Sequence, residues 1–265
     1  MKVGFIGCGN MGGALARAIG SICGVEILLT DRDSEKAEAL ARELGGKADT
    51  AESLCRECDF LFLGVKPNGL APLLSELDSA LKLNTGVVLV SMAAGVTLAT
   101  LESLTGSPYP TVRIMPNTPV AVGEGMTVYA KNALVTEEKE AEFLRIMKPT
   151  GTLDKLDEEL IDAACAVSGC GPAFAYMFID ALADGGVSAG LSRESALLFA
   201  AEMVKGAASM VLASADSPST LKERVCSPGG STIEGVKSLD ADGFSDTVRR
   251  AVKASFEKTK LLGKK

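Results

Sequence analysis

The fold class is decided by the segment KVGFIGCGNMGG, residues 2–13. Its first five residues are mostly apolar and predict a short buried strand, and the pattern GxGxxG at Gly7, Gly9 and Gly12 follows directly and opens a helical stretch. In that setting the glycines let backbone N–H groups at a helix N-terminus approach a pyrophosphate. We therefore predict a dinucleotide-binding unit, with Asn10 and Met11 in the same phosphate-binding turn.

Asp31 ends the next apolar run, 19 residues after Gly12. A carboxylate at this point of a dinucleotide-binding unit can accept a hydrogen bond from a ribose 2′-hydroxyl. The guanidinium of Arg32, beside it, could instead meet a 2′-phosphate. The sequence therefore leaves open whether NADH or NADPH is preferred.

Short apolar runs alternate with helical patterns through the first half of the chain. Continuous apolar strands separated by helices are typical of a parallel sheet covered on both faces. We expect an α/β, Rossmann-type, doubly wound domain over residues 1–156. The expected strands are residues 2–6, 26–30, 59–65, 86–90 and 111–115, with edge strands at 126–130 and 151–156; the expected helices are 11–18, 34–44, 69–81, 97–104 and 137–147.

From residue 157 the strand-like runs disappear and alanine-rich helical segments follow. The segment from Arg193 to Ala213 is apolar on most faces, and such a helix must be covered on most faces. A region of about 110 residues hardly covers it alone. We therefore expect residues 157–265 to form an all-α domain that self-associates as a dimer.

Composition excludes several classes of function. The net charge is −7 and the chain has no Lys/Arg tract, so we expect no nucleic-acid partner. The longest charge-free runs are interrupted by Gly, Ser, Thr, Asn or Pro, so we expect no membrane span. The apolar run at the N-terminus is only a few residues long before Gly-rich sequence begins, so we expect no signal peptide. Seven cysteines in no disulfide-like pattern indicate a cytoplasmic protein with reduced thiols. The chain has no histidine, and Cys55 and Cys58 form a C-x-x-C pair with no second pair to complete a metal site, so we expect no metal. The alternative interpretation of this pair is a helix end that runs into a strand.

Three further turns follow strand ends, where open α/β sheets bind ligands. They are Val65-Lys66-Pro67, SMAAG at residues 91–95, which contains Ala93 and Ala94, and MPNTP at 115–119, which contains Asn117. Each segment also has an interpretation without a ligand. Lys66 could be a solvated strand end, the Ala93-Ala94 segment a packed turn, and Asn117 a residue that caps its own backbone.

A separate segment, SPGGSTIEG at residues 227–235, predicts a Gly-Gly turn opening a helix. Ser231 and Glu234 have the S-x-x-E spacing of a capping box. Such a turn can present backbone N–H groups to a carboxylate, or can simply cap the helix.

These motifs, together with SGCGPA at residues 168–173, resemble the pyrroline-5-carboxylate reductases along the whole chain. The resemblance implies reduction of a cyclic imine carboxylate to proline with NADH or NADPH. It implies that Val65, Lys66, Pro67, Ala93 and Ala94 line the cofactor, that Asn117 approaches its nicotinamide end, and that Ser227 with Gly229, Gly230, Ser231 and Thr232 holds the substrate carboxylate and ring nitrogen. It also implies dimers through interlocked helical domains, often assembled into decamers.

The sequence departs from the family at Cys170 and Phe174, where Ser and Tyr are common. A hydride transfer to an iminium that arrives protonated needs positioning more than a base, and Thr232 could orient the nitrogen. The alternatives are a β-hydroxyacid dehydrogenase, against which the lack of lysine between Pro172 and Lys205 argues, and a non-catalytic NAD(P)-binding protein.

Overall fold

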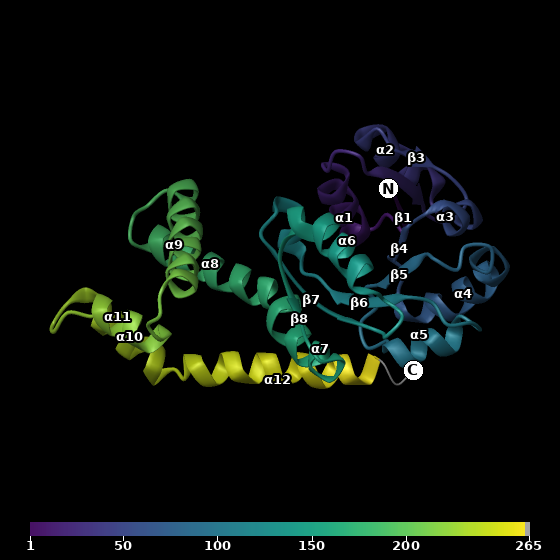
Figure 1. Ribbon diagram of the computed structural model, residues 1–265. Coiled ribbons are helices and arrows are strands. Elements are labelled where there is room, and N and C mark those ends of the chain that lie inside the picture. The colour runs from purple at the N-terminus through teal and green to yellow at the C-terminus, as the bar shows by residue number, and fades with distance from the viewer. Residues whose placement is uncertain (263–265) are drawn as a thin grey trace. The chain divides into compact units, whose positions relative to one another are not determined.

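The computed structural model describes residues 1–262 and consists of two units (Figure 1). Contacts group Met1–Cys170 with the stretch from Ala254 onward in the first unit, and Gly171–Lys253 in the second. The first unit thus extends beyond residue 156, because Ile161 and Cys165 pack on strand residues Met115 and Val128. The division into a cofactor domain of residues 1–156 and a dimerisation domain of residues 157–265 stays a prediction. Residues 263–265 lie outside the described residues.

The first unit contains one eight-stranded sheet in the order β3-β2-β1-β4-β5-β6-β7-β8. Neighbouring strands are parallel except β6 and β7, which are antiparallel. The strands are β1 (Lys2–Ile6), β2 (Glu26–Thr30), β3 (Lys47–Ala48), β4 (Phe60–Leu63), β5 (Val88–Ser91), β6 (Thr111–Met115), β7 (Gly125–Lys131) and β8 (Gly151–Lys155). The expected doubly wound sheet is confirmed, with β8 rather than β7 at its edge.

Helices cover both faces of this sheet. Helices α1, α2 and α6 pack on one face with Phe5 and Phe62, and α3, α4 and α5 pack on the other with Leu61 and Leu89. Such two-sided burial explains why the strands read as continuous apolar runs. The helices of this unit are α1 (Asn10–Gly20), α2 (Ser34–Leu44), α3 (Ala51–Glu57), α4 (Pro67–Leu81), α5 (Leu98–Leu104), α6 (Glu137–Met147) and α7 (Ile161–Ala164), with 3₁₀ turns η1 (Thr118–Val122), η2 (Lys148–Thr150) and η3 (Glu158–Leu160) and the π-helical turn η4 (Cys165–Gly169).

The second unit is entirely helical, as expected. Its elements are α8 (Gly171–Ser188), α9 (Arg193–Ala213), α10 (Pro218–Val225), α11 (Ser231–Ala241) and the first part of α12 (Phe244–Leu262). Helices α8 and α9 pack through Ala183, Ala196 and Ala200, and Gly186 lies close to Ala196. Small residues at this contact let the two backbones approach closely.

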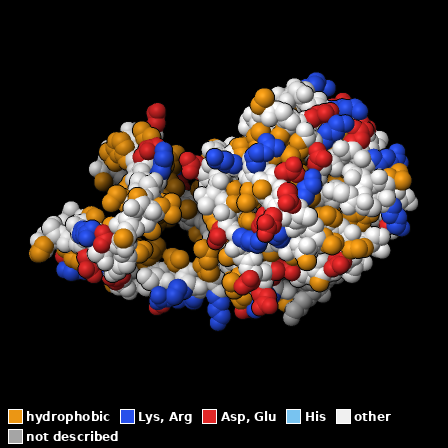
Figure 2. All heavy atoms as spheres, viewed as in Figure 1, with side chains coloured by type: hydrophobic (Ala, Val, Ile, Leu, Met, Phe, Trp, Pro, Cys, Tyr) orange, Lys and Arg blue, Asp and Glu red, His pale blue; other side chains and the backbone are white. Residues whose placement is uncertain are grey.

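The outer surfaces of α8 and α9 are unusually apolar, and hydrophobic side chains are visible there in Figure 2. The exposed apolar residues include Tyr176, Met177, Leu197, Leu198, Phe199, Met203, Met210 and Leu212. By length and composition alone, the stretch Glu158–Ser188 and α9 could each cross a membrane, a test that helices of soluble proteins also pass, so the expectation of no membrane span stays a prediction. The same surface would also suit association with another protein chain.

Candidate active site

Each glycine of the predicted phosphate-binding turn is required or permitted for a different structural reason. Gly7 has φ +102°, and a Cβ atom there would lie 2.6 Å from the Gly64 carbonyl oxygen. A Cβ atom at Gly12 would lie 2.1 Å from the Gly7 carbonyl oxygen, so this glycine permits close helix–strand packing. Gly9 has no atom within 4 Å of its Cβ position, which leaves open space at the N-cap of α1.

The N-terminus of α1 is arranged to receive an anion. Gly9 is its N-cap, no side chain caps it, and its first turn contains no acidic residue. The N–H groups of such a helix start carry partial positive charge and point outward. Backbone and space in this turn therefore fit a dinucleotide pyrophosphate.

Asp31 lies directly beyond β2 and is bonded to the same turn. Its carboxylate accepts hydrogen bonds from the Cys8 N–H at 2.6 Å and from the Asp33 N–H at 3.1 Å. Burial, followed by the Asp31 charge, raises the pKa of the Cys8 thiol to about 11, so this thiol stays neutral at pH 7. Asp31 therefore holds the turn in place, a contact that sequence spacing did not predict, and Arg32 beside it is exposed.

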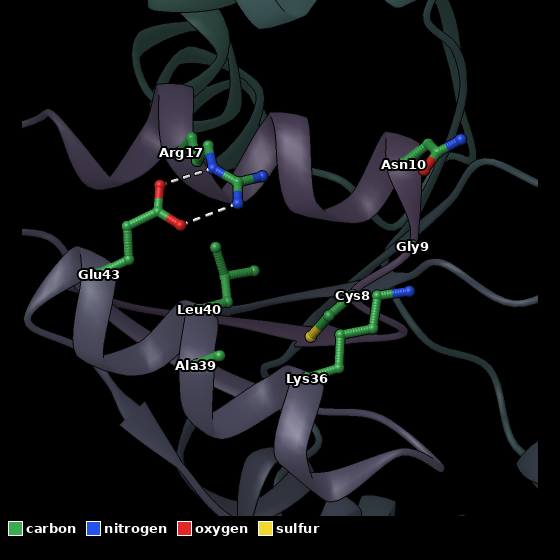
Figure 3. Close-up of a pocket in the computed structure, with 8 residues that line it drawn as sticks. All are labelled: Cys8, Gly9, Asn10, Arg17, Lys36, Ala39, Leu40 and Glu43. Carbon is green, nitrogen blue, oxygen red and sulfur yellow. Dashed lines mark hydrogen bonds and ion pairs between the residues drawn. The ribbon is translucent and has the colours of Figure 1, made fainter.

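A cavity of about 310 Å³ opens beside the turn, between α1 and α2 (Figure 3). Its lining includes Cys8, Gly9 and Asn10 from the turn, and Arg17, Lys36 and Glu43 from the two helices. The guanidinium of Arg17 is paired with Glu43 at 2.7 and 2.8 Å. The Lys36 ammonium has no carboxylate partner within residues 1–262, so it is the cation of this cavity that is available to a ligand. Sequence reasoning missed Lys36, although its place in the first turn of the helix after Asp31 was a usable signal.

The other predicted cofactor residues lie at the same end of the sheet, where the parallel strands have their carboxyl ends. Lys66 is the N-cap of α4, Pro67 occupies its first turn, and Val65 precedes them after β4. Ala93 and Ala94 follow β5, and the Ala93 N–H donates to Ser91 Oγ. Because β2, β1, β4, β5 and β6 are parallel neighbours, their carboxyl ends bring all these turns together in one unit.

Asn117 is buried, and both polar atoms of its side-chain amide make a hydrogen bond within the protein. Its Oδ1 accepts the Met126 N–H at 2.9 Å, and its Nδ2 donates to the Ser168 carbonyl oxygen at 3.0 Å. The amide therefore links the end of β6 to β7 and to η4, and it does not cap its own backbone. Asn117 therefore fixes the backbone of the turn after β6, and its approach to the nicotinamide end stays a prediction.

The predicted substrate segment forms a turn between α10 and α11 in the second unit. The Gly230 N–H donates to the Ser227 carbonyl oxygen at 3.0 Å, and Gly229 has φ +70° with open space around it. A Cβ atom at Gly230 would lie 2.5 Å from Ser227 Oγ. Ser231 and Thr232 are exposed in the first turn of α11.

The predicted capping box is wrong. Gly230, not Ser231, is the N-cap of α11, no side chain caps this helix, and Glu234 pairs with Lys237 at 2.7 Å. The extended conformation of Gly230 places Ser231 already inside the helix, where its hydroxyl cannot act as the cap. The first N–H groups of α11 consequently lack a side-chain acceptor and are available to a carboxylate.

The cysteines are distributed over both units of the chain. All seven are free thiols, and within the described residues no group of three or more metal-binding side chains occurs. Cys55 lies in α3 and Cys58 ends it just before β4, which is the helix-to-strand alternative. Burial raises the pKa of both thiols to about 12.

Two family models match the chain. Residues 158–262 match the model described as pyrroline-5-carboxylate reductase dimerisation, and residues 2–95 match NADP oxidoreductase coenzyme F420-dependent. The first match covers the helical region and the second covers the glycine-rich turn and the first strands of the sheet.

Similar proteins cover the chain from end to end. Pyrroline-5-carboxylate reductase of Escherichia coli is 40% identical over 99% of this chain and 98% of its own length. The reductase of Aquifex aeolicus is 38% identical over 99% and 97%. The crystal structure of the Plasmodium falciparum reductase with NADP bound is 33% identical, with a TM-score of 0.88 over 99% of this chain and 98% of that one. On this similarity, which confirms the resemblance seen in the sequence motifs, the chain belongs to the pyrroline-5-carboxylate reductase family.

Proposed function

We propose that this protein reduces 1-pyrroline-5-carboxylate to L-proline, with NADPH or NADH as the hydride donor. The observation that carries this proposal is the pair of helix N-termini without side-chain caps, at Gly9 of α1 and at Gly230 of α11. One suits a pyrophosphate and the other a carboxylate. The full-length relatives are named for this reaction, which favours it over the β-hydroxyacid dehydrogenase and non-catalytic alternatives.

For the cofactor, we assign the pyrophosphate to the turn of Gly7, Gly9, Asn10, Met11 and Gly12. Asp31 is placed to accept a ribose hydroxyl while it holds the Cys8 N–H, and Arg32 and Lys36 supply positive charge for a 2′-phosphate. Toward the nicotinamide end we assign Val65, Lys66, Pro67, Ala93, Ala94 and Asn117. A bound reduced nicotinamide supplies the hydride.

For the substrate, we assign the carboxylate to the N–H groups at the start of α11, with Gly229, Gly230 and Ser231 shaping the turn. Ser227 and Thr232 are the assigned catalytic residues. The Thr232 hydroxyl orients the ring nitrogen and holds its proton, because an iminium protonated by solvent needs no protein base. The absence of histidine from the chain is compatible with this chemistry.

The reaction would complete a proline biosynthesis route in the cytoplasm, where the seven free thiols remain reduced. The exposed apolar surface of α8 and α9 supports self-association of the helical region, residues 157–265, as a dimer rather than insertion into a membrane. Residues 1–156 form the proposed cofactor domain. Further assembly to a decamer rests on the family resemblance. The net charge of −7 favours a small-molecule partner over nucleic acid.

The direct test is the consumption of NADPH and of NADH by purified protein supplied with pyrroline-5-carboxylate. We expect turnover with at least one cofactor, and a 10-fold to 100-fold lower kcat, about 1.4 to 2.7 kcal/mol, in Thr232→Val. Ser238→Ala, a change on the same helix beyond the substrate turn, is the matched control. Folded, dimeric protein that consumes neither cofactor would refute the proposal, and oxidation of 3-hydroxy acids by the same sample would favour the dehydrogenase.

A further inference from the structure

A buried arginine lies behind the predicted cofactor site. Arg113 is on β6 between Val112 and Ile114, which pack into the core on one face of the sheet. Since strand side chains alternate, Arg113 points to the opposite face, and its side chain is 2% exposed. Its guanidinium pairs with Glu158 Oε1 at 3.3 Å and with Asp162 Oδ1 at 2.5 Å.

This ion cluster is connected to two of the turns assigned to the cofactor. Glu158 Oε1 also accepts the Leu98 N–H at 2.6 Å, at the first residue of α5, just beyond the Ala93-Ala94 turn. Ala94 and Leu98 pack on the same apolar cluster as Met115, the last residue of β6.

Asp162 provides the second connection. It lies in α7, which continues directly into η4, and the Ser168 carbonyl oxygen of η4 accepts the Asn117 amide. Arg113 thus joins, through two carboxylates, the turn after β5 and the segment that holds the turn after β6.

Stability alone is a weak explanation for such a cluster. Charges removed from water cost several kcal/mol, and apolar replacements of buried ion clusters are often as stable. The Nε atom of Arg113, moreover, is buried with no partner within residues 1–262, so the cluster is incompletely satisfied. What the planar guanidinium supplies is a fixed direction and distance between its two carboxylate partners.

We propose that Arg113, Glu158 and Asp162 are positioning residues that fix the Ala93-Ala94 turn relative to the Asn117 turn and thereby set the affinity for the nicotinamide cofactor. This inference rests on the proposed function. The three residues act through the backbone segments that they hold.

The test is the Kd for NADPH and NADH, measured by fluorescence titration well below the melting temperature of each variant. Glu158→Ala removes the acceptor of the Leu98 N–H and should raise the Kd about 10-fold, whereas Glu158→Gln keeps an acceptor oxygen and should stay within about threefold of wild type. Arg113→Met should raise the Kd by a similar factor. Glu158→Ala and Arg113→Met release the same segments. The Kd of the double variant should therefore be no more than about twofold higher than the Kd of whichever single variant binds the cofactor less tightly.

Glu140→Gln is the matched structural control. Glu140, itself poorly exposed, is the centre of another ion cluster, with Lys131 and the exposed Lys155, that contains no predicted cofactor residue. It should lower the melting temperature and leave the Kd within twofold. If Arg113→Met does not fold, Asp162→Ala and Glu158→Ala, at positions 24% and 28% exposed, decide the question, and each should raise the Kd about 10-fold.

Unchanged Kd values in folded Glu158→Ala and Asp162→Ala would overturn this inference and leave the proposed function standing. So would a double variant whose loss of affinity is the product of the two single losses. Wild-type protein that binds neither dinucleotide would instead overturn the proposed function, and this inference with it.

Discussion

The carboxylate of Asp31 accepts the Cys8 N–H, and it is also the group that we propose to bind a ribose hydroxyl. A substitution there therefore mixes a structural effect with an effect on cofactor choice. Asparagine separates the two effects, since its side-chain oxygen can still accept from Cys8 while its charge is gone.

We predict that Asp31→Ala and Asp31→Asn both shift the ratio of kcat/KM values toward NADPH, by about 10-fold, because a 2′-phosphate no longer meets a like charge. Asp31→Ala should in addition lower the melting temperature, and Asp31→Asn should not. Steady-state kinetics with both cofactors and a thermal melt measure the two effects. A preference ratio that stays the same in both variants would mean that Asp31 does not face the ribose.

Alanine substitutions at the two glycines of the proposed substrate turn should have opposite effects on stability and on the KM for the imine. Gly229→Ala introduces a Cβ atom at φ +70° in open space, so it should destabilise by about 1 kcal/mol and leave the KM for the imine near wild type. Gly230→Ala has an ordinary φ of −79° but pushes Ser227 Oγ aside, so it should raise that KM more than 10-fold with little loss of stability. Substrate kinetics and denaturant unfolding of both variants test this. Equal KM values in the two variants would remove Ser227 from the substrate site.

At the scale of elements, the sequence predicted the strands that are buried on both faces and missed the small ones. β1, β2 and β6 have the predicted bounds, because continuous apolar runs have few other uses. β3 is only Lys47–Ala48 and α3 is seven residues long, so neither repeats its hydrophobic period often enough to stand out in the sequence. The usable signal for α3 was Thr50, whose side chain accepts the Ser53 N–H as an N-cap.

Residue type alone did not predict which polar side chains are buried and paired. Arg113 lies in an apolar strand, and no periodicity distinguishes a buried, paired arginine from an exposed one. Its partners Glu158 and Asp162 are 45 and 49 residues away in the chain. Contacts of this separation depend on the tertiary fold, whereas a glycine-rich turn between a strand and a helix is local and can be predicted from neighbouring residues.

The contact of α6 with β7 and β8 makes a prediction about pH. Burial by itself raises the pKa of Glu140, but hydrogen bonds from Lys155, Lys131 and Tyr129 outweigh it and lower that pKa to about 2, from an ordinary value of 4.5. A lowered folded-state pKa stabilises the protein above pH 4.5, and this contribution is lost as the pH falls from 4.5 toward 2.

The free energy of unfolding should therefore fall by about 2 kcal/mol more in wild type than in Glu140→Gln over that range, after a discount for the exposed Lys155. Denaturant unfolding at a series of pH values measures the difference. Parallel pH profiles for the two proteins would show that Glu140 contributes nothing to acid sensitivity.

At the scale of the whole molecule, the exposed apolar surface of α8 and α9 predicts an obligate dimer. Light scattering at low micromolar concentration should give at least twice the mass of one chain, and Phe199→Glu, at a position 58% exposed, should reduce it to that of one chain and abolish turnover. Leu83→Glu, at a position 72% exposed in the first unit, is the control that should leave the assembly intact. A stable, active monomer of wild type, or protein that stays in solution only with detergent, would contradict the prediction.

The two edges of the sheet have a consequence for how chains can aggregate. An exposed strand edge is a template for pairing with another chain, and proteins protect it by shortness or charge. Here one edge is the two-residue β3, and the other is β8, where Asp154 and Lys155 are exposed. Neither edge offers a long apolar ladder, so concentrated protein should resist growth of intermolecular sheet, and its contacts between chains are left to helices.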